Sequence, residues 1–357
     1  MSDVYQQLAK KLDEMPNGYP ATESGVELKI LRKIFTPDEA EFWLKLKPIP
    51  ETAEAIAERL GAPLEEVQSQ LDNMTLKGEI ASAKMYGNQV YLQAPFVIGI
   101  FEFQLNRMDK EFADMVEDYV PALMSKVGGF APALTRVVPV NAAIDAQHQV
   151  HRYEDVRLMI EKAKSFQLQD CICRKEAALQ GHQCKHSVEV CLGLSTQEDG
   201  FEKYRLGRII SREEAMQVMA KEEEEGLVHT TYNVKSGHLY ICNCCSCCCG
   251  VLRGVKYFKA PYLMARSNFV AQLNADECAS CGVCANERCP MKAITEENGS
   301  YKVLPERCIG CGVCTGTCPT GAISLIPKPE TGRDEPPANL MDWAGKRAAS
   351  RGIKIIV

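Results

Sequence analysis

Cysteine is the residue whose abundance and spacing in this chain could do chemistry. Eighteen cysteines occur in 357 residues, and none of them precedes Cys171. A disulfide framework would spread its cysteines through a small secreted chain. Here they stand in tight groups, and closely spaced thiolates are the usual ligands of iron–sulfur clusters and of zinc. The pattern therefore indicates metal ligation.

Eight of the cysteines belong to an internal repeat within residues 276–325. The run CASCGVC at 278–284 returns thirty residues later as CIGCGVC at 308–314. Each run is followed by a Cys-Pro pair, which begins at Cys289 in the first block and at Cys318 in the second. Three cysteines at this spacing can wrap one face of a cubane cluster, and its fourth ligand then comes from elsewhere.

This repeat resembles the bacterial two-cluster ferredoxin domain, whose signature is C-x2-C-x2-C-x3-C-P given twice. The second block fits, whereas the first has four residues, 285–288, before its last cysteine. The resemblance implies two interlocked [4Fe–4S] clusters, each bound by three cysteines of one block and the last cysteine of the other. The ligands would be Cys278, Cys281, Cys284 and Cys318 for one cluster, and Cys289, Cys308, Cys311 and Cys314 for the other. A pair of zinc sites is the alternative, but zinc requires no repeated Cys-Pro pair.

The ten remaining cysteines are more than one ordinary cluster requires. Three interpretations stay open for them: one or two further iron–sulfur clusters, a zinc site, or a dithiol that cycles to a disulfide beside the clusters. We predict at least one additional iron–sulfur cluster. Its candidate ligands are Cys171, Cys173, Cys184, Cys191, Cys242, Cys244, Cys245, Cys247, Cys248 and Cys249.

Histidine and arginine side chains occur beside these cysteines. His182 and His186 flank Cys184 and are further candidate ligands, although a surface or hydrogen-bonded histidine is commoner. Arg174 follows Cys173 and could lower nearby thiol pKa values or offset cluster charge. The acidic run 222–225 is expected to be solvated.

The elements that must position these groups follow from helix and strand signals. The N-terminal region is predicted to contain three helices and a hairpin with a turn at Gly87-Asn88, an arrangement that resembles winged-helix proteins. Farther along we expect two amphipathic helices with a linker or an extended crossover between them at 127–140. A further helix should be followed by a hairpin that leads into Cys242 and looks like a second small winged unit. A last helix should pack back over its own domain. The predicted helices are 37–46, 51–60, 63–77, 109–123, 153–166, 212–225 and 339–349, and the hairpin strands are 80–84, 89–92, 227–232 and 238–241.

These elements predict an α+β chain with four parts. They are a winged-helix domain at 1–95, a mixed helical and hairpin cysteine-rich domain at 96–265, a two-cluster ferredoxin-like domain at 266–327, and a tail at 328–357. This order resembles a group of iron–sulfur proteins from anaerobic bacteria that share the ICNCCSCCCG-type run.

The resemblance favours an electron-transfer protein that relays single electrons between a redox partner and a third cluster in the cysteine-rich domain. One alternative is a reductase whose middle cluster or dithiol reduces a small substrate or a disulfide, so whether the chain is an enzyme stays open. A second alternative is a redox-sensing transcription regulator. There is no G-x-G-x-x-G fingerprint after a strand and no P-loop, so neither a dinucleotide fold nor ATP hydrolysis is indicated.

Charge and hydropathy narrow the class of partner. The chain carries 41 basic and 47 acidic residues, a net charge of −6, and residues 1–150 hold 22 acids against 14 bases, a net of −8. DNA binding needs cations that face phosphates, so this charge disfavours DNA and favours a redox protein that docks on the N-terminal domain.

No apolar run reaches the roughly 20 residues of a membrane span. We expect a cytoplasmic protein without a signal peptide.

Overall fold

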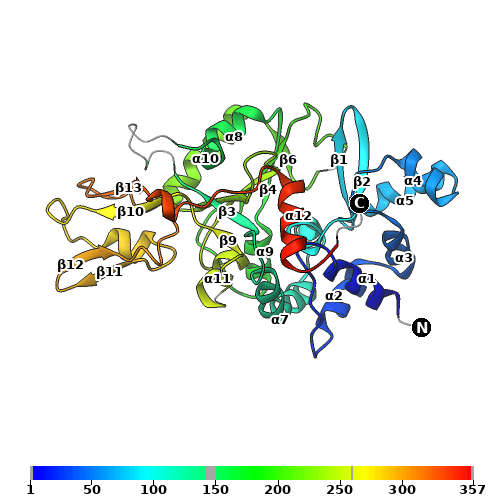
Figure 1. Cartoon of the computed structure of the whole chain (residues 1–357), viewed down its shortest axis with the longest axis horizontal. Coiled ribbons are helices and arrows are strands. Elements are labelled where there is room, and N and C mark those ends of the chain that lie inside the picture. The colour runs from blue at the N-terminus through cyan, green and yellow to red at the C-terminus, as the bar shows by residue number, and fades with distance from the viewer. Residues whose placement is uncertain (1–2, 141–142, 144–149, 204, 259, 355–357) are drawn as a thin grey trace.

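The computed structural model describes residues 3–140, 143, 150–203, 205–258 and 260–354. The chain contains both helices and mainly antiparallel sheets, so the fold is α+β, as predicted. In Figure 1 the N-terminal helices lie at one end of the long axis and strands β10–β13 lie at the other, with a large sheet between them. Within these described ranges, no helix is both long and apolar enough to cross a bilayer.

The N-terminal region contains the predicted helices and hairpin, preceded by two further helices. Thr36 begins α3 with a capping box, in which its hydroxyl accepts from the Glu39 amide and the Glu39 carboxylate accepts from the Thr36 amide. The hairpin turn lies at Tyr86-Gly87, because Met85 pairs with Asn88. The elements are α1 (Val4–Asp13), α2 (Val26–Ile34), α3 (Pro37–Lys45), α4 (Ala53–Leu60), α5 (Leu64–Leu76), β1 (Ala81–Met85) and β2 (Asn88–Leu92). The winged-helix assignment stays a prediction.

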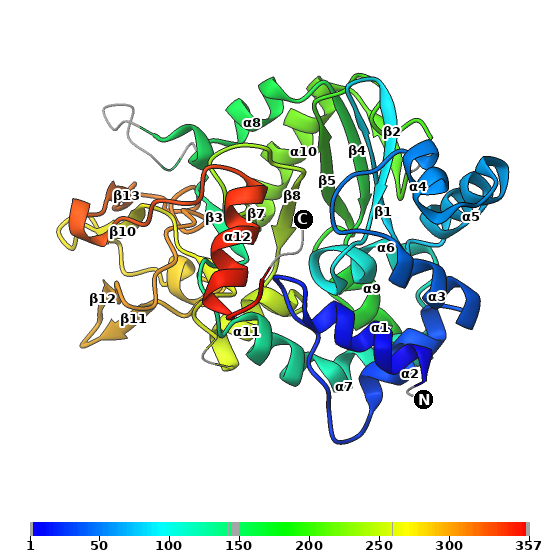
Figure 2. The same cartoon turned by 45° about the vertical axis from the view of Figure 1, so that its right-hand side comes forward.

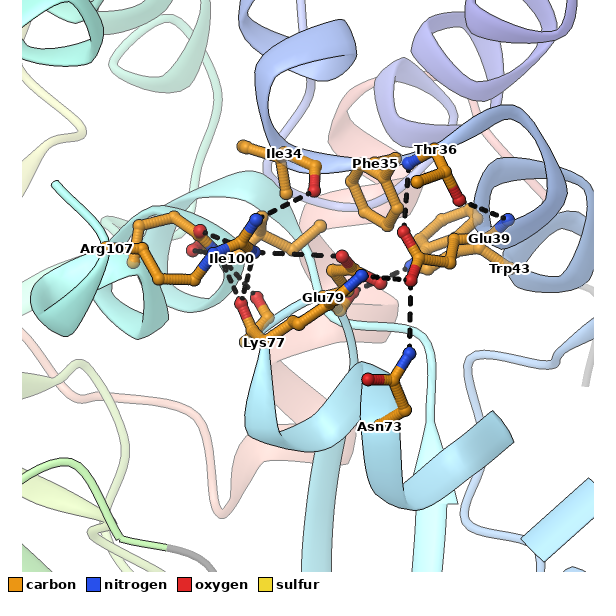
Figure 3. Close-up of polar contacts among 12 residues, drawn as sticks. Ile34, Phe35, Thr36, Glu39, Trp43, Asn73, Lys77, Glu79, Ile100 and Arg107 are labelled. Atoms are coloured by element: carbon orange, nitrogen blue, oxygen red, sulfur yellow. Dashed lines mark hydrogen bonds and ion pairs between the residues drawn. The ribbon is translucent and has the colours of Figure 1, made fainter. Parts of the chain in front are cut away.

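A buried carboxyl lies at the centre of this region. Figure 3 shows Glu79 between Trp43, Glu39 and Arg107. Its side chain is fully buried, and neither carboxylate oxygen has a hydrogen-bond partner among the described residues. Arg107 lies 3.7 Å away, and Lys77 pairs with Glu39. Burial, followed by the charge of Glu39, raises the pKa of Glu79 to about 8.

The middle of the chain forms a seven-stranded sheet in the order β6-β4-β5-β8-β7-β3-β9. Neighbouring strands are antiparallel except β3 and β9, which are parallel. The strands are β3 (Thr135–Val138), β4 (Ser165–Asp170), β5 (Glu189–Ser195), β6 (Arg208–Ile210), β7 (Val228–Tyr232), β8 (Tyr240–Cys244) and β9 (Met264–Ala265).

This sheet corrects two expectations and refines a third. The predicted helix 153–166 is a short helix that gives way to strand β4, so a strand rather than a helix leads into Cys171. The stretch 127–140, expected to be a linker or an extended crossover, contains the extended strand β3, all four residues of which are buried. The hairpin β7–β8 forms as predicted, but both strands have further partners, β3 and β5, so it belongs to the large sheet and not to a second winged unit.

Helices cover both faces of the sheet (Figure 2). On one face α8 and α10 pack against β4 and β5 around Phe166 and Leu192. Helix α7 contacts α9 and α11 on the other face. Ser211 caps α10 through the Glu214 amide. The helices are α6 (Phe101–Phe103), α7 (Lys110–Val127), α8 (Val156–Lys162), α9 (Ile172–Leu179), α10 (Arg212–Glu225) and α11 (Gly250–Tyr257).

The repeat forms a separate layer of two small sheets, and the tail returns to the N-terminal end. Antiparallel pairs join β10 (Phe269–Leu273) to β13 (Ile323–Pro327) and β11 (Ile294–Glu297) to β12 (Ser300–Val303). The last helix, α12 (Leu340–Ser350), forms as predicted but packs against distant parts of the chain and not over its own domain: the Trp343 indole donates to the carbonyl of Ala133. Buried Arg347 donates to four main-chain carbonyls, namely those of Pro16, Val127, Phe130 and Pro132.

Candidate metal centre

The eight cysteines of the repeat surround two cavities. The last cysteine of each block lies at the cavity of the other block, which is the placement that interlocked ligand sets require. The cavities lie on either side of the β10–β13 pair's ends and are lined mainly by apolar residues. One cavity is lined by Cys278, Cys281, Cys284 and Cys318, and the other by Cys289, Cys308, Cys311 and Cys314.

Main-chain amides point at the cysteine sulfurs. The amide of Ala293 donates to the Cys289 sulfur at 3.2 Å, and that of Ala271 donates to the Cys308 sulfur at 3.5 Å. Such bonds stabilise thiolates and tune the potential of a cluster bound to them. Gly312 adopts a φ of 81°, and a β-carbon there would lie 2.8 Å from Ala143. The donor set of four cysteines at each cavity, with amides that donate to their sulfurs, therefore fits a [4Fe–4S] cluster.

The two cavities differ in their exposure. Cys281 of the first cavity is exposed, whereas Cys311 and Cys314 of the second are buried. The carbonyl of Cys311 accepts from Val140, which follows strand β3 of the large sheet. Burial raises the pKa of Cys311 to about 12, so this thiol stays protonated until a metal displaces the proton. The first cavity faces solvent, and the second lies beside the sheet.

The four-residue spacer in the first block has a structural role. Residues Cys284–Arg288 form a single π-turn that ends beside Cys289. The Arg288 guanidinium donates to the carbonyls of Glu223 and Glu224 at the end of α10, and also to that of Val313. A cation is favoured at a helix C-terminus. The spacer thus attaches the repeat to the large sheet's helix layer.

Six of the ten remaining cysteines form a closed ring of thiols. The pKa of each thiol is shifted by two others of the set, so these interactions close into a ring. Hydrogen bonds from Cys173 and Cys191 hold the pKa of Cys171 well below its usual range. In order around the ring, the cysteines are Cys171, Cys173, Cys249, Cys244, Cys242 and Cys191.

Regular elements position this six-thiol ring. Cys242 and Cys244 lie two residues apart on β8 and therefore on one face, opposite Ile241, which packs under α8 and α10. Cys171 and Cys249 are the N-cap residues of α9 and α11. The positive ends of two helices thus meet at the ring, and this favours thiolates and an anionic metal centre there.

The other four cysteines gather in a second group. The sulfurs of Cys184, Cys245, Cys247 and Cys248 all lie within 4.8 Å of one another. Cys245 and Cys248 are buried, whereas Cys247 is exposed. This four-thiol group comes from the loop after α9 and the loop between β8 and α11. The ten cysteines are therefore brought together as six and four.

The neighbouring polar residues differ in their roles. Arg174 is 1% exposed, donates to the carbonyls of Ser187 and Asn243, and contacts the Cys245 thiol, so its charge lies beside the four-thiol group. His186 lies 3.6 Å from the Glu225 carboxylate, and neither it nor His182 belongs to the four-thiol group. The acidic run 222–225 is not simply solvated, because Glu222 is buried and Glu225 accepts from Ser187.

Two features were missed by the sequence reasoning. The division of ten cysteines into six and four depends in part on β8, which runs beyond the predicted strand 238–241 to Cys244 and so places Cys242 and Cys244 on one face. For the attachment by Arg288, the signal in the sequence is that this residue belongs to the spacer of the first block, which is one residue longer than that of the second. Its acceptors lie 64 and 65 residues away in the sequence.

The comparisons with known proteins concern the repeat. Residues 301–324 match the family model of the 4Fe-4S binding domain, which includes the cysteines of the second block. The chain is also 41% identical over 51 residues to an uncharacterized ferredoxin of Methanocaldococcus jannaschii. This match covers 14% of the chain and 81% of that ferredoxin.

Longer relatives match over the same kind of short stretch. The chain is 42% identical over 57 residues to the electron transport protein HydN of Escherichia coli, which is 15% of this chain and 32% of HydN. It is 46% identical over 43 residues to the putative electron transport protein YsaA of Escherichia coli, which is 12% of this chain and 27% of YsaA. The chain thus spans about a third of the length of the curated relatives it first matches.

Proposed function

Because the chain belongs to the 4Fe-4S ferredoxin family through its C-terminal domain, we propose that it is an iron–sulfur electron-transfer protein. It relays single electrons between a redox partner and the six-thiol ring, which binds a third cluster. The two relatives from Escherichia coli that are named as electron transport proteins support this proposal. A bound [4Fe–4S] cluster supplies one-electron redox chemistry at a potential that the surrounding protein sets. Two clusters in the repeat are part of the proposal, with the interlocked cysteine sets as their ligands.

One observation carries the proposal: cysteines of the repeat and of the ring share a single buried apolar cluster. Cys244 and Cys249 of the ring lie in it together with Cys284, Cys308 and Cys311. Apolar packing excludes water and lowers the local polarity around charged centres. The chain thus keeps the three proposed sites within one continuous interior, with the exposed Cys281 at the solvent end.

A reductive titration followed by electron paramagnetic resonance tests this function. The full chain, purified without oxygen, should take up about two electrons in the repeat and at least one more at the ring. Cys242→Ala should abolish the additional uptake and leave the signals of the repeat in place. Cys247→Ala is the matched control, because this cysteine lies in the same loop region but outside the ring. Unchanged uptake in Cys242→Ala would contradict the third centre.

The N-terminal region is the proposed docking surface for the redox partner. Four apolar side chains are exposed there: Tyr86 is 93% exposed, Leu76 73%, Leu64 45% and Met85 38%. Together with the surplus of acidic residues, such a surface suits a protein partner better than DNA. The N-terminal core is continuous with the interior beside the ring, since one apolar cluster contains N-terminal residues together with Ile172, and Cys173 packs against that cluster.

Reduction kinetics with two electron donors test the docking surface. A bacterial two-cluster ferredoxin, reduced beforehand, serves as the protein donor, and reduced methyl viologen serves as a small donor that needs no docking. The double variant Leu76→Ser and Tyr86→Ser should slow reduction by the protein donor and leave reduction by the dye unchanged. Met341→Ser, at an exposed apolar residue outside the region, is the control. Equal slowing by both donors, or none, would count against N-terminal docking.

The second candidate function is a reductase that uses the ring as a dithiol. The mutual contacts of the six thiols favour it, because neighbouring thiols can exchange two electrons by forming a disulfide. An iron content of about eight per chain, with free thiols at the ring, would support this function over the third cluster. About twelve irons would support the cluster.

A further inference from the structure

The four-thiol group has the dimensions of a site for a single metal ion. The sulfur of Cys184 lies 3.8 Å from that of Cys245 and 3.7 Å from that of Cys247, and the sulfurs of Cys247 and Cys248 are 3.6 Å apart. An ion that binds four sulfurs tetrahedrally at about 2.3 Å separates them by about 3.8 Å. The thiols therefore already stand at the corners of such a tetrahedron.

The other cysteine sets of the chain provide an internal comparison. Among the residues that the structure describes, the four-thiol group is the one set in which three or more candidate ligands lie within 4.8 Å of one another. The sets around the two cavities of the repeat are more widely spread. That spread is expected of a cluster, since each thiolate binds a different iron at a different corner of the cubane. Spacing thus separates a mononuclear site from cluster sites within one molecule.

We propose that Cys184, Cys245, Cys247 and Cys248 bind one structural zinc ion and not an iron–sulfur cluster. Four cysteines in a closed tetrahedron are the usual ligands of structural zinc. Zinc also binds such ligands more tightly than ferrous iron does. Four thiolates and Zn²⁺ carry a net charge of −2, and the buried Arg174 beside Cys245 offsets part of it. Binding releases the protons of those thiols that are still protonated.

The zinc ion would join the loop after α9 to the loop between β8 and α11. Cys245, Cys247 and Cys248 lie directly between the ring residues Cys244 and Cys249, in a loop that contains no strand or helix. Cys184 lies in a different loop, so a shared ion fixes the two loops to each other. Zinc does not change its oxidation state, so this site is independent of the proposed electron transfer.

Metal analysis of the full chain tests the proposal. The protein is produced in medium that contains both iron and zinc, purified without oxygen, and assayed for both metals and for sulfide. We expect about one zinc per chain, with zinc-edge absorption that reports four sulfurs at about 2.3 Å. Cys184→Ala should lower zinc by about tenfold or more and leave iron and sulfide unchanged. Cys281→Ala, at an exposed cysteine of the repeat, is the matched control: it should lower iron and leave zinc unchanged.

Three outcomes would overturn the proposal. Loss of iron together with sulfide in Cys184→Ala would make the group part of a cluster. Loss of a single iron without sulfide would make the ion iron and not zinc. An unchanged metal content would remove the site altogether. Cys247→Ala is measured alongside, because this side chain is exposed and its removal leaves the packed interior intact. A metal loss shared by both variants is then a property of the site and not of one misfolded protein.

Discussion

In the ferredoxin repeat the cysteines lie outside the strands, in loops and turns that fold around their own cavities, whereas half of the six-thiol ring lies within the strands β5 and β8. The remaining ring cysteines lie at the first residues of helices α9 and α11. In a loop, the spacing of the cysteines in the sequence sets where the ligands lie. A strand carries it in the register of the sheet, which brings Cys191 beside Cys242 because Leu192 pairs with Ile241. The grouping of cysteines can therefore be predicted from the sequence in the repeat but not in the six-thiol ring.

The strongest test of the local region concerns its interlocking. Cys318→Ala removes the last cysteine of the second block and should eliminate the cluster bound by the first block, a loss of about four irons per chain. The remaining resonance signal should match that of Cys278→Ala and differ from that of Cys314→Ala, because Cys318 lines the same cavity as Cys278. Matching signals from Cys318→Ala and Cys314→Ala would show that each block binds its own cluster. The contrast with the ring would then disappear.

A glycine pair tests how tightly the local region is packed. Gly310 and Gly321 have φ values of 69° and 70°, so alanine is strained to the same degree at both. A β-carbon at Gly310 would lie 2.2 Å from the carbonyl oxygen of Phe269, whereas one at Gly321 has no atom within 4 Å. We expect Gly310→Ala to cost about 3 kcal/mol or more of unfolding free energy, and Gly321→Ala about 1 kcal/mol. If denaturant unfolding showed equal losses of free energy in the two variants, the loop at Gly310 would have shifted to make room for the added methyl group.

The junction between the two regions depends on Arg288. Removing its hydrogen bonds to the end of α10 in Arg288→Ala should lower the unfolding free energy by about 2 kcal/mol. Proteolysis should become faster between the repeat and the sheet. Arg307→Ala, at an exposed arginine of the second block, should change stability by less than about 0.5 kcal/mol. If the two variants behave alike, the spacer in the first block has no docking role.

A further effect should arise outside both regions, at Glu79. Its pKa is raised from 4.5 to about 8 by burial, so between these values the folded chain holds a proton that the unfolded chain has released. Unfolding free energy should therefore fall as pH rises through this window, by up to about 1.4 kcal/mol per pH unit. Glu79→Gln should be relatively more stable at pH 8 than at pH 5.5, with iron and zinc contents unchanged. A parallel pH dependence in both proteins would assign the effect to another group.

The success of the sequence reasoning follows the same division between local and distant information. Helices α3, α4, α5 and α10 were predicted because caps and apolar spacing lie within each segment, as at Thr36 and Ser211. Strands β3 and β4 were missed because their partners are distant: Val137 pairs with Thr230. Likewise, all ten middle cysteines were named as candidate ligands, but their division depends on how the sheet and two loops assemble.

The hydrogen bonds of Arg347 to four main-chain carbonyls have a consequence for the timing of folding on the ribosome. Its guanidinium bonds the carbonyl of Pro16, which lies 331 residues earlier in the sequence. At a synthesis rate of about 5–20 residues per second, the N-terminal segment waits for roughly 15 to 70 seconds before this partner exists. By the end of that interval all eighteen cysteines have been synthesised, since the last of them, Cys318, precedes Arg347. Metal insertion can therefore begin before Arg347 has bound the carbonyl of Pro16. The tail then packs against the N-terminal segment at a time when all the cysteines are available to bind metal.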